Sequence, residues 1–441
     1  MHSAISGSPE GQSHGARSPR LIETDIRPWL ALSSVLSLIC LLVIPFPLGF
    51  DPNAWVTWAT AIGHGNSIKF VVEPGWKPLP VIVMAPFAAV SVSLAAAVWM
   101  FIVRFCAFLI PVLIFRLVQP TFGTKAAVLS AISPLAIPVL WVVSADGHSE
   151  AVVTACALAA AGLIRSGHRR GAIVLATALC LMRPEAILIL AAFGLWFMRK
   201  RDWEGVALLL LAALVFTVGW FVVPWIVSGD AFTTAKVSRR IPPFRTGLTT
   251  LENLRRPTSN GIWPPRLLMA PLVVAGLVAL RQKRDRPIEL LVGSAAVFTA
   301  IAVATLVSGS AGDPRYFLVS SITACCLVGP GAMLLIDMIR SAKAATAVFA
   351  ALDCPASTIV VDYVSWPQLA ARIEHPMGDF NYVAEAPTVA VEQSAGADAA
   401  SRLNRYTVIS GTTGPPRVAA RFPTGDKTWT VSYHHGAARC R

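Results

Sequence analysis

Long blocks of apolar residues, separated by short polar and basic segments, dominate the hydropathy pattern of the chain. Most blocks have about the length that a helix needs to cross a bilayer, roughly 20 residues. The blocks that we interpret as spans are residues 29–49, 95–118, 126–144, 151–164, 171–182, 186–198, 204–227, 267–280, 288–308 and 316–338. One further block, 79–92, is short and flanked by prolines. The pattern predicts an all-α polytopic membrane protein with about 10–11 transmembrane helices.

Composition agrees with this class. Of the 441 residues, 55% are hydrophobic and only 14% are charged. In a typical soluble protein about a quarter of all residues are charged. The formal charge is +13, but no basic stretch interleaved with aromatic residues argues for a nucleic-acid partner. The expected contacts of these cations are membrane lipids.

Lys and Arg choose between two topologies, which differ in whether residues 79–92 cross the membrane. If 79–92 does not cross, seventeen basic residues gather in loops on one side. The opposite side then receives the charged residues Asp51, Asp146, Glu150, Arg183 and Glu185. Because Lys and Arg favour cytoplasmic loops, we expect a multi-pass plasma-membrane protein with a cytoplasmic N-terminus and a non-crossing 79–92.

The two ends of the chain differ in composition from the transmembrane domain, residues 29–340. Residues 1–28 are rich in Ser, Gly and Pro and predict a disordered cytoplasmic leader. Residues 341–441 contain strand-like stretches, separated by Gly and Pro, at 357–364, 406–409 and 428–433. These stretches predict a small α/β C-terminal appendage or a partly ordered tail.

The first outer loop, residues 50–94, begins with an acid at the mouth of a span. A carboxylate is costly to desolvate in the position of Asp51, so it usually faces water or performs a task. Trp55 and Trp58 follow at helical spacing and predict a short interfacial helix with its tryptophans at headgroup depth. Asp51 would cap this helix, and capping alone is the alternative to a functional role.

The second outer loop, residues 144–150, is a polar segment on the same expected face as Asp51. Its Asp146, His148 and Glu150 could bind sugar hydroxyls, bind a phosphate through a divalent ion, or contact one another. Three residues so close on one loop rarely complete a metal site alone. Glu150 could instead be an acid of a first helical turn, stabilised by the helix dipole.

Cations and acids also interrupt later apolar blocks. Arg183 and Glu185 must pair or line a polar cavity, and a pair that only fastens helices together is the alternative. Arg315, at the entrance of the last span, could bind a phosphate or reach the headgroups. Arg104 lies in mid-span and needs a buried partner.

One more outer loop, residues 228–266, departs from the charge rule. It holds seven Lys and Arg residues against two acids. Arg239 and Arg240 are among them and could bind phosphate groups, and contact with lipid headgroups is an equally good interpretation.

Taken in order, these motifs resemble a known pattern. They are Asp51 after the first span, the segment Lys77-Pro-Leu-Pro80, the mid-span Arg104, the acidic second loop, Arg183-Pro-Glu185 and Asp313-Pro-Arg-Tyr316. The order is similar to that of GT-C superfamily integral-membrane glycosyltransferases. The nearest resemblance is to polyprenyl-phosphate-sugar-dependent enzymes of the aminoarabinose-transferase and protein-mannosyltransferase type, including actinobacterial relatives, and it covers about residues 25–340.

The resemblance implies roles for the loop acids. Asp51 corresponds to the catalytic base or metal-linked acid of the first outer loop, and Asp146 or Glu150 to the acid that helps to hold acceptor or donor. Many members carry paired acids in the first loop, whereas Pro52 and Asn53 follow Asp51 here. We therefore expect a metal-independent base, no metal-ligand residues and no firmly predicted cofactor, with a divalent cation as the less favoured alternative.

Together these interpretations predict a membrane glycosyltransferase. It would move a mannose- or arabinose-like sugar from a polyprenyl-phosphate donor to a glycan, lipid or protein acceptor of the cell envelope, at the outer face. With Asp51 as the catalytic base, the expected substrate-binding residues are Lys77, Asp146, His148, Glu150, Arg183, Glu185, Arg239, Arg240 and Arg315. The rival hypothesis is a transporter or lipid-linked-sugar flippase, although the chain lacks the two related halves common in transporters.

Overall fold

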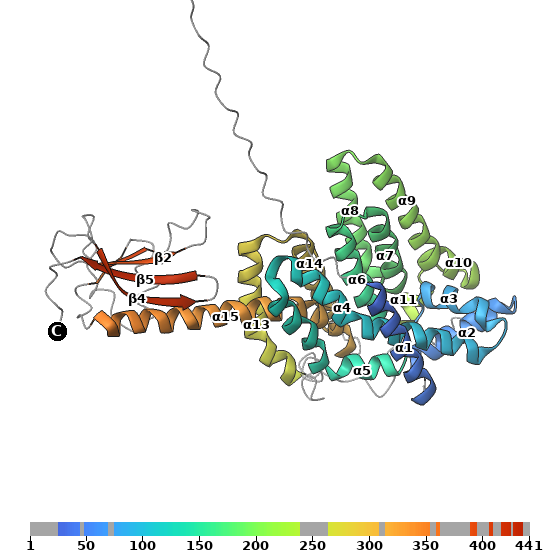
Figure 1. The fold of residues 1–441 in the computed structure, drawn as a ribbon. Helices are drawn as coiled ribbons and strands as arrows, with labels where there is room; N and C mark the ends of the chain where they lie inside the picture. Colours follow the sequence, from blue (N-terminus) through green and yellow to red (C-terminus); the bar gives the residue numbers. More distant parts are fainter. Residues whose placement is uncertain are drawn as a thin grey trace, which may run out of the picture. The chain divides into compact units, whose positions relative to one another are not determined.

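The computed structural model describes residues 25–44, 48–68, 75–238, 263–307, 314–352, 359–361, 389–394, 405–408, 416–424 and 427–434. These residues form helices and one sheet (Figure 1). The chain divides into two compact units. One comprises Met1–Arg266 and Asp285–Cys326, and the other Leu267–Arg284 and Leu327–Arg441.

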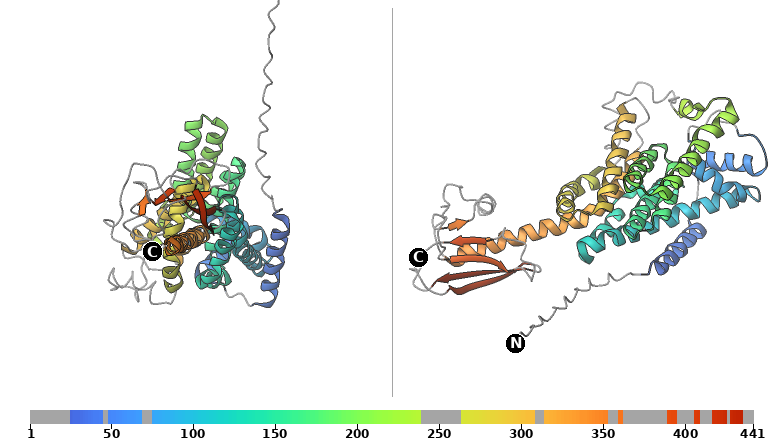
Figure 2. Two further views of the ribbon diagram at one scale, coloured as in Figure 1. Left: turned by 60° about the vertical axis from the view of Figure 1, so that its left-hand side comes forward. Right: turned by 90° about the horizontal axis from the view of Figure 1, so that it is seen from above.

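The first four helices of the first unit are packed together. They are α1 (Arg27–Val43), α2 (Phe50–Gly63), α3 (Pro78–Ala88) and α4 (Val92–Ile132). α2 and α3 lie side by side, and both contact α4 (Figure 2). α3 is roughly 16 Å long, too short by itself to cross a hydrocarbon core of roughly 30 Å. This length agrees with the expectation that 79–92 does not cross.

The predicted span 126–144 is not one helix, and this expectation was wrong. α4 is bent at Gly123, whose φ of 81° lies in the left-handed region that favours glycine. The helix then ends, and a 3₁₀ turn at Ser133–Ala136 leads into α5 (Pro138–Ala145). Pro134 and Pro138 lack the backbone N–H that a continuous helix would require, so the block is divided there.

The middle of the first unit holds the helices that follow α5. They are α6 (Glu150–Arg165), α7 (Arg169–Met182), α8 (Ile187–Lys200), α9 (Trp203–Thr217), α10 (Val223–Ser228) and α11 (Thr233–Ser238). α5 and α6 meet at a bend of 115°, which leaves residues 146–149 as a short loop. α6 packs along α4 and α7, and α7, α8 and α9 lie side by side (Figures 1 and 2).

The last helices belong partly to each unit. They are α13 (Trp263–Lys283), α14 (Arg286–Val307), the 3₁₀ turn η5 (Pro314–Phe317) and α15 (Leu318–Leu352). In the second unit α13 and α15 lie so close together that a Cβ on Gly331 would be only 1.8 Å from the carbonyl oxygen of Leu272. Small residues at such crossings let two backbones pack together, as is common in membrane helices.

The chain is a multi-pass membrane protein. Among the described residues, four helical stretches are long and apolar enough to cross a membrane, or five if the bent pair α5 and α6 counts as one span. The four are Val92–Ala136, Trp203–Ser228, Arg286–Ala304 and Leu318–Arg340. Other predicted spans coincide with shorter helices such as α1, so the number of ten or eleven crossings stays a prediction.

Arg104, the costly mid-span cation, bonds to a helix end. Its guanidinium donates a hydrogen bond of 2.6 Å to the carbonyl oxygen of Cys40, in the last turn of α1. The Cys40 carbonyl also accepts a hydrogen bond from the N–H of Ile44, and carbonyls at the end of a helix carry partial negative charge. The partner that the sequence required is therefore backbone rather than an acid, and it ties α1 to α4.

The C-terminal appendage combines the end of α15 with a five-stranded sheet. The strands are β1 (Ile359–Val361), β2 (Val389–Ser394), β3 (Arg405–Val408), β4 (Pro416–Thr424) and β5 (Lys427–His434). Their order is β1-β3-β2-β5-β4, and the pairings are antiparallel. β1 lies within the stretch predicted at 357–364, and β3 and β5 overlap those predicted at 406–409 and 428–433.

Candidate active site

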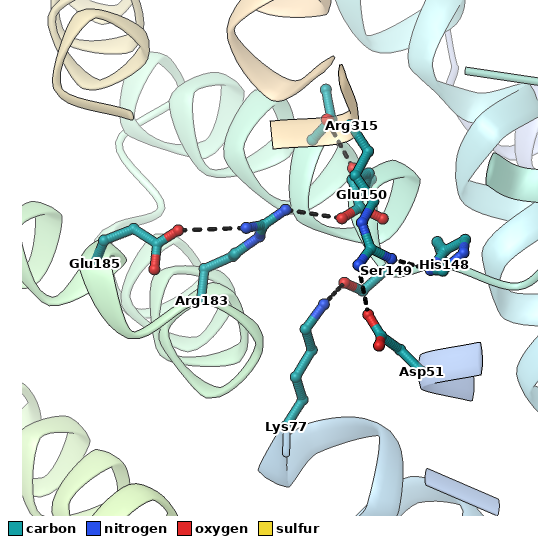
Figure 3. Close-up of polar contacts among 9 residues, drawn as sticks. Asp51, Lys77, His148, Ser149, Glu150, Arg183, Glu185 and Arg315 are labelled. Carbon is teal, nitrogen blue, oxygen red and sulfur yellow. Dashed lines mark hydrogen bonds and ion pairs between the residues drawn. The ribbon is translucent and has the colours of Figure 1, made fainter. Parts of the chain in front are cut away.

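Asp51 lies in the first turn of α2 with its carboxylate turned into the protein (Figure 3). The residue is only 8% exposed, and its Oδ2 lies 2.9 Å from a guanidinium nitrogen of Arg315. Gly49 occupies the N-cap position, and no side chain caps the helix, so the predicted capping role was wrong. The carboxylate is held by an ion pair instead.

The tryptophan face of α2 is buried inside the protein. Trp55 and Trp58 are 0% and 2% exposed, so their rings face other helices rather than lipid headgroups, and the depth of α2 in the membrane stays a prediction. α3 and α4 cover this face, and Trp55 packs edge-on against Trp99 of α4 with 5.6 Å between ring centroids. Trp99 in turn donates a 2.7 Å hydrogen bond to the carbonyl of Gly147. The aromatic rings therefore fix α2 and the 146–149 loop to α4.

Two glycines allow the backbone to approach the site closely. The N–H of Gly49 donates to the carbonyl of Asp146 at 2.8 Å, and a Cβ on Gly49 would lie 2.8 Å from Nε2 of His148. A Cβ on Gly75 would lie 2.9 Å from Oδ1 of Asp51. Only glycine fits these two positions without displacing the site.

Arg315 connects the start of α15 to two other elements. It lies in η5, directly before that helix. One guanidinium nitrogen contacts Asp51, and another lies 2.7 Å from Nδ1 of His148 in the 146–149 loop. Burial, and after it the positive charge of Arg315, lowers the pKa of His148. The site thus holds one cation between an acid and an imidazole.

Lys77 brings a second cation to the site, and its contacts differ from those of Arg315. Its ammonium donates a 2.6 Å hydrogen bond to the hydroxyl of Ser149 and lies 4.8 Å from the ring centroid of Trp55. Among the residues that the structure describes, no carboxylate oxygen lies within 4 Å of it. Burial lowers the pKa of Lys77 to about 8, although the charge of Glu150 opposes this. An ammonium has three donors, so this group can still bind an anion.

Glu150 and Arg183 form the deepest ion pair of the site. Glu150 opens α6 and is 1% exposed, and its Oε1 accepts a 2.7 Å hydrogen bond from Arg183. A carboxylate oxygen of Glu185 lies 3.5 Å from the same guanidinium. Within the described part of the chain, Oε2 of Glu150 has no hydrogen-bond partner. A buried acceptor in this state is costly, which makes it a candidate to receive a hydroxyl of a bound molecule.

The structure brings together most of the residues that the sequence singled out. We call this group the Asp51 cluster: Asp51, Lys77, His148, Ser149, Glu150, Arg183, Glu185 and Arg315 (Figure 3). They come from segments up to 264 positions apart in the chain, between Asp51 and Arg315. Ser149 was missed, although it lies inside the polar loop that drew attention to its neighbours.

Three predicted residues are not in this cluster. The side chain of Asp146 makes no hydrogen bond or ion pair with any described residue, and only its backbone carbonyl contributes, through Gly49. Arg239 and Arg240 lie outside the described residues, so their predicted role is untested.

No group of three or more His, Cys, Asp or Glu side chains in the described ranges is arranged to hold a metal ion.

Comparison with known proteins gives structural similarity only. No protein-family model and no curated protein matches the chain. Among solved structures, the chain is similar to ArnT from Cupriavidus metallidurans bound to undecaprenyl phosphate, with 16% identity and a TM-score of 0.48 over 74% of this chain and 65% of that one. The same protein in the apo state gives 15% identity and a TM-score of 0.47, over 73% and 65%.

A second protein among the solved structures is an oligosaccharyltransferase. The enzyme from Archaeoglobus fulgidus, in the apo form, matches with 12% identity and a TM-score of 0.42, over 71% of this chain and 51% of that one. The chain therefore spans just under two thirds of ArnT and about half of the oligosaccharyltransferase. ArnT is an aminoarabinose transferase. At these identities the likeness concerns the arrangement of helices.

Proposed function

We propose that the protein is a membrane glycosyltransferase that moves a sugar from a polyprenyl-phosphate carrier to an acceptor hydroxyl at the outer face of the membrane. The observation that carries this proposal is a buried acid accompanied by a cation that, among the residues the structure describes, has no acid in contact. Asp51 supplies the carboxylate, and within the same described part of the chain the Lys77 ammonium contacts a hydroxyl and a ring face. A lipid phosphate is an anion that such a cation can bind.

The proposed reaction uses Asp51 as general base. Its carboxylate takes the proton of the acceptor hydroxyl while the hydroxyl oxygen attacks the anomeric carbon of the sugar. The bond from that carbon to the phosphate oxygen breaks, and its electron pair leaves with the lipid phosphate. A well-placed base contributes roughly 10²–10⁴-fold in rate.

The cations of the cluster stabilise the charge that develops on the leaving phosphate. Arg315 contacts Asp51 directly, Lys77 lies over the ring of Trp55, and Arg183 is held by Glu150. Such prearranged charges act most strongly in a site that excludes water. Oε2 of Glu150 would accept a hydroxyl hydrogen bond from the sugar or the acceptor.

The finer identities follow the sequence resemblance. We propose a mannose- or arabinose-like sugar, and a glycan, lipid or protein acceptor of the cell envelope. The N-terminus would lie in the cytoplasm, so that the Asp51 cluster faces the opposite side.

The test is incubation of the purified full-length chain with a panel of polyprenyl-phosphate sugars and acceptor fractions, with measurement of released polyprenyl phosphate. Release by the wild-type chain but not by Asp51→Asn supports the proposal. Asp146→Asn is the matched control, since it removes a neighbouring acid whose side chain makes no hydrogen bond or ion pair with a described residue. Movement of a labelled donor across vesicles without any release would support the transporter hypothesis instead.

A further inference from the structure

We propose that His148 is a positioning residue, which as a neutral imidazole holds the Arg315 guanidinium against the Asp51 carboxylate. Its effect on turnover rests on the proposed function, whereas its protonation state is a property of the folded chain. The two can therefore be tested apart.

The direction of the hydrogen bond fixes the state of the ring. A guanidinium has five N–H donors and no acceptor. Because Arg315 lies 2.7 Å from Nδ1 of His148, that nitrogen must present its lone pair. The ring proton is therefore on Nε2, and the imidazole is neutral. An imidazolium has donors on both nitrogens and could not make this contact.

The 146–149 loop holds the ring in place. The backbone N–H of His148 donates to the carbonyl of Val143 at 2.9 Å. Gly147 has a φ of 80°, in the left-handed region, and a Cβ there would lie 2.7 Å from the sulfur of Met100. The Nε2 side of the ring lies directly against Gly49. Because ring and backbone are fixed, His148 can determine where the guanidinium lies.

Arg315 needs such an anchor. It lies in a single 3₁₀ turn, and a long side chain on a short turn has many rotamers to lose. The contacts of 2.7 Å to His148 and 2.9 Å to Asp51 fix two different nitrogens of one planar group. That plane orients the carboxylate toward an acceptor hydroxyl.

The charges around His148 come from four elements. Arg315 of η5 and Lys77 before α3 disfavour the imidazolium, while Glu150 of α6 and Asp51 of α2 favour it. Burial is the largest influence and also disfavours it. His148 therefore stays neutral around pH 7 and gains a proton only in acid, where it would release Arg315.

The first experiment compares pH profiles of the full-length chain. His148→Asn keeps an acceptor oxygen near the place of Nδ1 but does not titrate, and His148→Ala removes the acceptor. With the donor that the panel identifies, His148→Ala should lose roughly tenfold to a hundredfold in turnover, the worth of a charged hydrogen bond. His148→Asn should restore most of it and shift the acid limb of the profile to lower pH. Wild-type turnover in His148→Ala, or an unshifted acid limb in His148→Asn, would overturn the proposal.

The second experiment needs no substrate. In ¹⁵N-histidine-labelled protein, the signal missing from His148→Asn belongs to His148. At pH 7 it should show a bare Nδ1 and a protonated Nε2, and a proton on Nδ1 would refute the inference. If no donor is turned over by the wild-type chain, the proposed function fails while this measurement still decides the role of His148. Where turnover is found, His148→Ala should cost little more in an Arg315→Lys background, because coupled residues are not additive.

Discussion

Helix α6 carries a cluster of charges at each end, and the two clusters are built differently. Glu150 begins the helix in the Asp51 cluster. Arg165 ends it, roughly 22 Å away, in what we call the Asp285 cluster: Thr121, Arg165, Asp285 and the carbonyl of Leu117. In the Asp285 cluster both carboxylate oxygens contact Arg165, at 2.6 and 2.5 Å. Thr121 and the backbone N–H of Ile288 also donate to that carboxylate.

The Asp51 cluster is less complete. Lys77 has a hydroxyl and a ring where Arg165 has a carboxylate, and Oε2 of Glu150 has no partner among the described residues. Buried charges are ordinarily paired because an isolated one is costly. The Asp285 cluster shows that this fold can give a buried carboxylate partners for both of its oxygens. The incomplete pairing among the described residues at the other end is therefore a property of that site, as expected where a charged substrate binds.

The largest expected effect is at Asp51. Asp51→Asn should lower turnover by roughly 10²-fold or more, because the amide cannot accept the acceptor's proton. Binding of decaprenyl phosphate should stay intact or become tighter, since Arg315 loses its anionic partner. Turnover with the donor panel and titration with the lipid phosphate measure the two quantities. Near-normal turnover would remove Asp51 from the mechanism.

Asp285→Asn should mainly affect stability. Removing one partner of a buried pair costs roughly 3–5 kcal/mol, which thermal unfolding in detergent would record, while turnover per folded molecule should not change.

Lys77→Met should have the opposite effects on stability and turnover. It removes an ammonium that has no ion pair among the described residues, so stability should be equal or higher and activity lower. Equal destabilisation by both variants would erase the distinction between the clusters.

The charge of Lys77 should make phosphate binding pH-dependent. Since burial lowers its pKa to about 8, the ammonium is charged below pH 8 and loses its charge above it. A phosphate monoester has completed its second ionisation, with a pKa of roughly 6, below this range. Affinity for decaprenyl phosphate should therefore fall by roughly tenfold between pH 7 and pH 9.5. Lys77→Arg, which keeps its charge, should bind with no such decline, and a decline identical to wild type would exclude Lys77 as the cause.

The smallest effect is expected at Asp146. Its side chain makes no hydrogen bond or ion pair with a described residue, so Asp146→Asn should change turnover by less than roughly twofold, in the range of substitutions away from special contacts. Glu150→Gln should lower turnover more than Asp146→Asn does, because this substitution weakens the 2.7 Å ion pair with Arg183. A larger loss in Asp146→Asn than in Glu150→Gln would reverse the assignment of the loop acid.

The residues of the candidate site could be predicted from the sequence, whereas most of their contacts with one another could not. Apolar block lengths and ionisable residues within them are strong signals in a membrane chain, because each misplaced charge is costly. Asp51, Glu150 and Arg183 were found in this way. The pairing of Asp51 with Arg315 could not be predicted, since 264 positions separate them and only packing brings them together.

Other errors arose from neighbours that the local pattern does not contain. The spacing of Trp55 and Trp58 predicts an amphipathic helix correctly, but whether lipid or protein covers its apolar face depends on α3 and α4. In the same way, the acidic loop suggested several alternative roles for His148, and the positioning role that we propose rests on its contact with the distant Arg315. Local sequence predicts an element, and tertiary contacts determine which role its side chains take.

Gly75 also provides a way to recognise other chains that could share this chemistry. Because any Cβ at that position would intrude on Oδ1 of Asp51, an aspartate and an arginine at positions 51 and 315 are not sufficient evidence of an intact site. A related chain that keeps both but has a bulkier residue at 75 must carry its carboxylate elsewhere. In a survey of genomes or a mutant library, a residue with no functional group of its own would therefore separate working copies from inactive ones.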